Sequence, residues 1–172
     1  RAVSPEVICK LMTDQKPLPE KLAFSRDLFV LLFLLRGMPF VDLAFLRRCD
    51  LQGNVITYHR RKTSRKLTVV VGKEAMEIIR RYMYAIPDSP YLFPIIQNPG
   101  ENEYGQYTRM LRLLNHRLTQ VANTLGIRER LSTYVARHTW ATTALRQNYN
   151  SSLICNAMVI WSITCSLSRN RK

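Results

Sequence analysis

The sequence predicts one domain that is mainly α-helical and carries a small antiparallel β-hairpin. Three observations support this fold class: 172 residues of which 47% are apolar, several stretches whose apolar residues recur every three to four positions, and one short region rich in β-branched residues. A chain of this length is sufficient for a domain with a substantial core. No internal repeat is visible, so the elements are expected to pack around that one core.

The first two expected helices lie before Arg36. Residues 5–12 predict a short helix that ends before a proline-containing break. A longer helix is expected to start near Ser25, with Asp27 in its first turn. It carries the most apolar run of the chain, residues 28–35. Because this run is much shorter than the ~20 residues that cross a bilayer, it predicts a buried helix.

Helices are also expected on both sides of a proline-rich loop in the second half of the chain. Residues 40–46 resume a helix after Gly37 and Pro39 interrupt the apolar run. Four prolines within residues 87–100 predict a loop. The clearest helix is 104–125, because its apolar residues share one face and Gly126 follows it. The remaining helices are expected at 73–84, 134–146 and 151–158.

A basic β-hairpin is expected between the helices at 40–46 and 73–84. Residues 54–60 and 67–71 predict its two strands. Five of the nine residues in 58–66 are basic. A solvated loop is one interpretation, and a basic ribbon tip that enters a DNA groove is the other. The basic residues are Arg60, Arg61, Lys62, Arg65 and Lys66.

The charge balance indicates a polyanionic partner. Lys and Arg number 26 against 12 Asp and Glu, which gives a formal net charge of +14. Such a field concentrates nucleic acid near the surface, although a solvated basic surface without a ligand is the simpler alternative. A membrane surface is disfavoured because no long amphipathic basic helix is present. The four cysteines are far apart and form no zinc motif, which predicts reduced, cytosolic thiols.

Two clusters could carry chemistry. Arg36 ends the apolar run beside Gly37, and a guanidinium next to a core needs an anionic partner. That partner is either Asp42 or Asp27 in a salt bridge, or a bound anion. The second cluster is Tyr134, Arg137 and His138, which share one face of a helix capped by Ser132 or Thr133.

Two arginines and a lysine suit phosphodiester transfer. Paired guanidinium groups supply donors for the negative charge that develops on the phosphate oxygens. A lysine can protonate a leaving 5′ oxygen. For His138 alone, a core or supporting role is the simpler interpretation.

Three segments, 35–44, 61–63 and 134–141, resemble in order and spacing the boxes of the tyrosine recombinase (phage integrase) family. They are most similar to integrases of Bacteroides mobile elements, and the resemblance covers about residues 2–158. It implies a mainly helical DNA breaking-rejoining catalytic domain with a small sheet. In that family a tyrosine attacks a DNA phosphate, forms a 3′-phosphotyrosyl link and frees a 5′ hydroxyl, without metal or other cofactor.

The resemblance assigns a role to each candidate residue. Arg36 and Arg137 correspond to the two clamp arginines, and Lys62 corresponds to the lysine that protonates the leaving oxygen. Tyr134 stands where many members place a histidine, and its phenol can hydrogen-bond a phosphate oxygen. DNA contacts are expected from Arg60, Arg61, Arg65, Lys66 and His138.

The C-terminus departs from the family pattern. Val159 and Ile160 stand in the places of the family's Gly-His pair, and Arg169 lies near the place of the nucleophilic tyrosine. No tyrosine follows Tyr149. No nucleophile is therefore assigned, and the chain as written is expected to hold a phosphate without cutting the strand.

The expected organisation is a catalytic domain over residues 1–158 and an aberrant tail over 159–172, produced by a frameshift or by decay. Only about 35 residues precede Arg36, so the family's N-terminal core-binding domain is expected to be missing. The resemblance implies double-stranded DNA as the partner, tetramers on paired sites, no membrane, no small-molecule substrate, and a bacterial cytoplasmic location at the nucleoid. The alternatives are a non-catalytic nucleic-acid-binding module and a decayed remnant.

Overall fold

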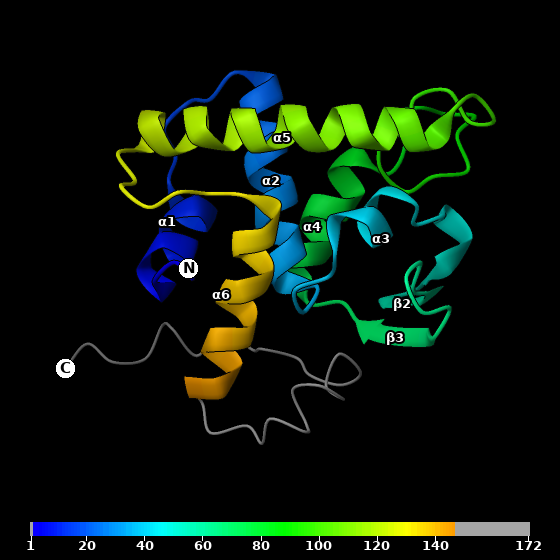
Figure 1. Cartoon of the computed structure of the whole chain (residues 1–172), viewed down its shortest axis with the longest axis horizontal. Coiled ribbons are helices and arrows are strands. Elements are labelled where there is room, and N and C mark those ends of the chain that lie inside the picture. Colours follow the sequence, from blue (N-terminus) through cyan, green and yellow to red (C-terminus); the bar gives the residue numbers. More distant parts are fainter. Residues whose placement is uncertain (1, 147–172) are drawn as a thin grey trace.

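The computed structural model describes residues 2–146 and confirms the mainly helical fold class (Figure 1). Within this range six α-helices surround one core, and a three-stranded antiparallel sheet with the order β1-β2-β3 lies at one end. A short 3-10 turn, η1 (Arg48–Asp50), precedes the sheet. The helices are α1 (Pro5–Thr13), α2 (Glu20–Leu34), α3 (Phe40–Ala44), α4 (Lys73–Tyr82), α5 (Glu103–Leu125) and α6 (Thr133–Arg146). The strands are β1 (Leu51–Gln52), β2 (Val55–His59) and β3 (Lys66–Val70).

Helix α2 is the centre of the core. Apolar residues occupy all of its sides after the first turns, and a helix of this kind is stable only when other elements cover it completely. It packs against α1, α4, α5 and α6, and Figure 1 shows α5 lying across its upper part. Leu28, Phe29, Leu31 and Leu32 are fully buried. The burial of each such side chain stabilises the folded state by about 1.5–3 kcal/mol.

The predicted start of this helix was wrong. The helix begins at Glu20, directly after Pro19, so Ser25 lies inside it rather than at its cap. The Ser25 hydroxyl donates a hydrogen bond to the Lys21 carbonyl at 2.8 Å, which satisfies it within the helix. Glu20 and Lys21 are exposed and therefore lack the apolar signal from which the start was predicted.

The predicted hairpin is confirmed, with one additional strand. Strands β2 and β3 pair from Val55 opposite Val70 to His59 opposite Lys66. Strand β1 pairs with β2 and has only two residues, too few for a recognisable alternation. The connection between β2 and β3 is closed by a hydrogen bond from the Arg60 N–H to the Arg65 carbonyl at 2.9 Å.

Local signals set the ends of the last two helices. Asn102 caps α5 by accepting the Gly105 N–H at 3.1 Å, and Gly126 ends this helix at φ 65°. Ser132, one of the two predicted caps of α6, accepts the Val135 N–H at 3.2 Å. The expected helix at 151–158 and the tail at 159–172 lie outside the described residues.

Candidate functional site

Arg36 lies at the turn that follows α2, and it is 3% exposed. Its backbone is left-handed, with φ 63°, and Gly37 continues the turn at φ 65°. Glycine adopts this conformation freely, whereas a residue with a side chain pays about 1–2 kcal/mol for it. Strain of this kind persists only where the surroundings enforce it, and it is common at functional sites. The turn directs the chain from α2 into α3.

Helix α6 brings Arg137 to this turn. The Arg137 Nη1 donates a hydrogen bond to the Gly37 carbonyl at 2.6 Å. A Cβ placed on Gly37 would lie 3.3 Å from the Cα, Cγ and carbonyl oxygen of Arg137. Arg137 therefore contacts the residue that follows Arg36, although about a hundred residues separate them in the sequence.

The start of the loop between β2 and β3 completes the cluster. Asp42 of α3 is 3% exposed and accepts the Arg61 N–H through Oδ1 at 3.0 Å. Its Oδ2 lies 4.0 Å from Arg60 Nε. Burial raises the pKa of Asp42, although Arg60, Arg137 and the Arg61 N–H act in the opposite direction. Burial and the neighbouring Arg60 lower the pKa of Arg137, whereas Tyr58 and Asp42 raise it. These residues therefore share one electrostatic environment.

Neither aspartate considered for Arg36 forms a salt bridge with it in residues 2–146. Asp27 forms ion pairs with arginines of α2 and α4, including Arg81, and Asp42 forms an ion pair with Arg60. Burial lowers the pKa of Arg36 to about 10, because removing the guanidinium from water disfavours its charged form.

The hairpin tip is anchored on one side and open on the other. The Arg61 guanidinium lies 3.8 Å above the Phe45 ring, a cation–π geometry. Lys62, Arg65 and Lys66 are exposed. Within residues 2–146 none of these three side chains forms a hydrogen bond or an ion pair. The structure thus brings Arg60 and the Arg61 backbone to the cluster and leaves Lys62 exposed in the same loop.

Tyr134 and His138 lie together in the first turns of α6. Their ring centroids are 4.2 Å apart in an edge-on arrangement, as expected for residues four apart on a helix. Tyr134 is 66% exposed, so its hydroxyl is accessible to a ligand.

The sequence interpretation missed the roles of Asp42, Gly37 and Phe45. Asp42 was considered only as a partner of Arg36, yet it holds the hairpin through the Arg61 N–H. A carboxylate in the middle of the apolar helix α3 was the available signal, since buried charges are rare unless something binds them. Nothing local in the sequence indicates the contacts of Gly37 and Phe45.

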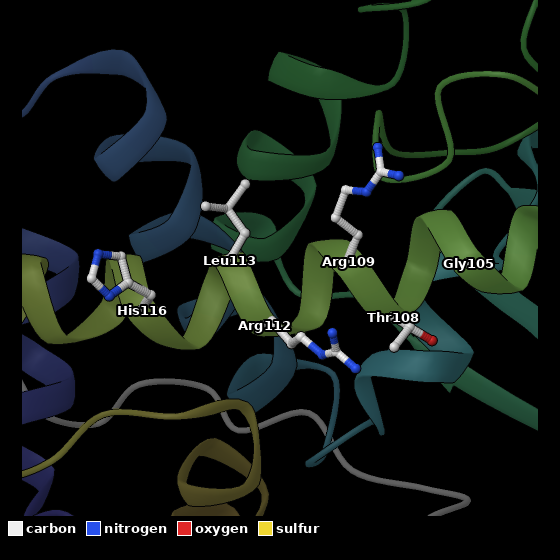
Figure 2. A pocket seen from close by; sticks show the side chains of 6 residues that line it. All are labelled: Gly105, Thr108, Arg109, Arg112, Leu113 and His116. Atoms are coloured by element: carbon white, nitrogen blue, oxygen red, sulfur yellow. The ribbon is translucent and has the colours of Figure 1, made fainter.

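A second basic surface lies on α5 (Figure 2). It is an open pocket outside the arginine cluster, and Figure 2 shows Arg109 and Arg112 leaving the helix on opposite sides. No acidic residue occurs between Glu103 and Glu129. The lining residues are Gly105, Thr108, Arg109, Arg112, Leu113 and His116.

Neither a metal-binding cluster nor a membrane span is present in residues 2–146. No group of three or more His, Cys, Asp or Glu side chains is placed there to hold a metal ion. No helix in this range is long and apolar enough to cross a bilayer.

The fold is similar to those of solved recombinases. The XerA recombinase superposes with a TM-score of 0.67 at 17% identity, over 94% of this chain and 57% of that chain. The Tn1549 transposon integrase, in complex with transposon right end DNA, has a TM-score of 0.65 at 14% identity, over 100% of this chain and 62% of that chain. The lambda integrase catalytic core has a TM-score of 0.58 at 11% identity, over 91% of this chain and 90% of that chain. At these identities the likeness establishes the fold.

The family follows from the sequence match. The model of the phage integrase family matches residues 1–159, and the chain belongs to this family. It spans about half the length of the first recombinases it resembles, 57% of XerA and 46% of XerH. Curated proteins gave no match. The narrower resemblance to integrases of Bacteroides mobile elements stays a prediction.

Proposed function

We propose that this chain is the catalytic domain of a DNA recombinase or integrase, and that it binds a phosphodiester of double-stranded DNA at Arg36 and Arg137. The hydrogen bond from Arg137 to the Gly37 carbonyl carries the proposal, because it joins the elements that present the two arginines. Paired guanidinium groups provide planar donors that match phosphate oxygens. Family membership supports DNA as the partner, and the related XerH recombinase was solved bound to its difH substrate.

The other site residues have roles in the same proposal. Lys62, exposed at the hairpin tip, corresponds to the lysine that protonates the leaving 5′ oxygen in the cleavage reaction of the family. The exposed Tyr134 hydroxyl donates a hydrogen bond to a phosphate oxygen. The DNA backbone is contacted by Arg60, Arg61, Arg65, Lys66 and His138. Contacts of this kind position the duplex without reading its sequence.

Strand cleavage by the chain as written is not part of the proposal. The family reaction needs a nucleophilic tyrosine, and no tyrosine follows Tyr149 in the sequence. We therefore propose that residues 1–158 act as a DNA-holding catalytic domain and that residues 159–172 do not supply the nucleophile. Assembly into tetramers on paired sites, and work at the nucleoid in the bacterial cytoplasm, belong to the same proposal.

A non-catalytic nucleic-acid-binding module is the second candidate. The net charge of +14 and the basic surface of α5 favour it. In such a module Arg36 and Arg137 would contribute only general positive charge. A decayed remnant would keep the same basic surface.

A double-mutant cycle separates the two candidates. Binding of a fluorescent duplex is measured for the wild type, Arg36→Ala, Arg137→Ala and the double variant, with the exposed Arg128→Ala as a control that removes the same charge. Each clamp variant is expected to lose about 10-fold more affinity than the control, as for a charge-assisted hydrogen bond. The double variant is expected to lose less than the product of the single losses.

Two results would contradict the proposal. If Arg36→Ala and Arg137→Ala each lose no more duplex affinity than Arg128→Ala, and their losses are independent, the chain is a basic nucleic-acid-binding module. A covalent protein–DNA adduct on a nicked duplex, seen in a denaturing gel, would contradict the absence of a nucleophile. Thermal unfolding of every variant confirms that affinity is compared between folded proteins.

A further inference from the structure

We propose that Gly37 is a positioning residue that holds Arg36 and Arg137 as one preassembled clamp before DNA binds. This inference rests on the function proposed above, because it concerns the same phosphate site. It assigns to a glycine, which has no side chain to contact DNA, a specific part in anion binding.

The backbone at this turn is constrained from both sides. Arg36 and Gly37 are consecutive left-handed residues, with φ 63° and 65°. The Arg36 N–H is bonded to the Phe33 carbonyl at 3.1 Å, and the Arg36 side chain is 3% exposed. The carbonyl of Gly37 is therefore presented in one direction, toward α6.

Arg137 contacts Gly37 at two points. Its backbone and Cγ approach so closely that a Cβ on Gly37 would stand 3.3 Å from the Arg137 Cα, Cγ and carbonyl oxygen. The end of its side chain returns to the same residue, where Nη1 donates to the Gly37 carbonyl at 2.6 Å. A Cβ at this position would be closer than most Cβ contacts in proteins, so Arg137 would have to shift by a few tenths of an ångström, and the positive φ would add strain.

The consequence is that Gly37 links the two arginines. Arg36 is the residue before it, and the Arg137 guanidinium is bonded to its carbonyl. Of the five N–H donors of a guanidinium, Arg137 uses one on Gly37. Fixing a long side chain before the ligand arrives reduces the entropy lost on binding. A displaced Gly37 carbonyl would release the Arg137 side chain and remove this advantage.

Matched glycine variants test the inference. Gly53 and Gly126 also have positive φ, 60° and 65°, but a Cβ at either would meet nothing within 4 Å. Gly53→Ala and Gly126→Ala therefore reproduce the backbone cost of Gly37→Ala without touching Arg137. We expect Gly37→Ala to lose about 10-fold in duplex affinity and the controls less than about 2-fold. The slope of log affinity against log salt concentration reports the number of phosphates contacted. This slope should become shallower by about one contact in Gly37→Ala and stay unchanged in the two controls.

The combination with Arg137→Ala identifies the mechanism. If Gly37 acts through Arg137, Gly37→Ala should cause no further loss of affinity in the Arg137→Ala protein. A full additional loss there, or an affinity of Gly37→Ala equal to that of Gly53→Ala, would overturn the inference. If Arg36→Ala and Arg137→Ala themselves fail to weaken binding, the proposed function fails instead, so the two failures are distinguishable.

A measurement on the wild type covers the case in which Gly37→Ala does not fold. In 15N-arginine-labelled protein without DNA, the guanidinium of Arg137 should rotate slowly, with its signal assigned by comparison with Arg137→Lys. The exposed Arg128 serves as the reference for free rotation. If Arg137 rotates as fast as Arg128 in the absence of DNA, the clamp is not preassembled and the inference is wrong.

Discussion

Two buried aspartates on successive helices, Asp27 of α2 and Asp42 of α3, have very different surroundings. Asp27 is 4% exposed and Asp42 is 3% exposed. Asp27 Oδ1 accepts two hydrogen bonds from Arg26, at 3.0 and 2.9 Å. Its Oδ2 accepts the Tyr82 hydroxyl at 2.8 Å and the Arg81 guanidinium.

Asp42 has a less complete set of partners. Its Oδ1 accepts the Arg61 N–H at 3.0 Å. Its Oδ2 is buried and has no hydrogen-bond partner within residues 2–146, and the nearest cation is Arg60 Nε at 4.0 Å.

The difference separates a carboxylate with a full set of partners from one that lies beside the candidate site. Away from the arginine cluster the chain satisfies a buried charge fully and thereby ties α2 to α4. Beside the cluster it retains a charge that is incompletely satisfied, which proteins tolerate mainly where function requires it. The carboxylate of Asp42 acts on Arg137 and Arg60 electrostatically and holds the loop between β2 and β3 through the Arg61 N–H. Three predictions test this contrast.

The largest effect is expected from Asp27→Ala. The change leaves the half-buried Tyr82 hydroxyl and the Arg81 guanidinium without their acceptor. We expect the free energy of unfolding in urea to fall by about 2–3 kcal/mol. The exposed loop residue Asp88 is the control, since Asp88→Ala should change the free energy of unfolding by less than about 0.5 kcal/mol. Duplex affinity of the folded Asp27→Ala protein should stay that of the wild type, and a loss of affinity would show that Asp27 also serves the site.

A smaller effect is expected at Asp42, and it depends on the replacement. Asp42→Asn keeps an oxygen for the Arg61 N–H and removes the buried charge, so the free energy of unfolding should stay within about 1 kcal/mol of the wild type. Asp42→Ala removes the acceptor and should cost about 1–2 kcal/mol. Equal destabilisation by both replacements, measured in urea, would mean that the negative charge itself stabilises the fold.

The smallest effect is expected in the pH dependence of the stability difference between wild type and Asp42→Asn. Burial raises the pKa of Asp42, so the folded state binds a proton at a higher pH than the unfolded chain does. The wild type therefore gains stability as the pH falls through this raised pKa, whereas Asp42→Asn has nothing to titrate. The free energy of unfolding of Asp42→Asn relative to wild type should be highest near neutral pH and should decrease toward pH ~4. A difference that stays constant over this range would contradict the raised pKa.

Local signals predicted most of the helices because they act within a few residues. The apolar period and Gly126 located α5, and Ser132 located the start of α6. The start of α2 was misplaced because its first turn is polar and exposed. Strand β1 was missed because two residues carry no period.

The candidate site was predicted in part. Arg36 and Arg137 were identified by residue type and motif, and the structure joins them through Gly37. Lys62 was placed correctly on the hairpin, but the anchoring of that hairpin by Asp42 and Phe45 was not foreseen. These contacts join α3 to a hairpin about twenty residues away, beyond the reach of any local pattern.

The sequence by itself determined the helical class and the basic character of the surface, and it singled out Arg36 and Arg137 as candidates, because periodicity, charge and residue chemistry are properties of the chain alone. Only the tertiary structure decided which of two similar aspartates became fully satisfied and which stayed at the site. It also decided that Gly37 contacts Arg137. The physical reason is that hydrogen bonds and close packing act over a few ångströms in space, and the folded core brings distant segments within that range.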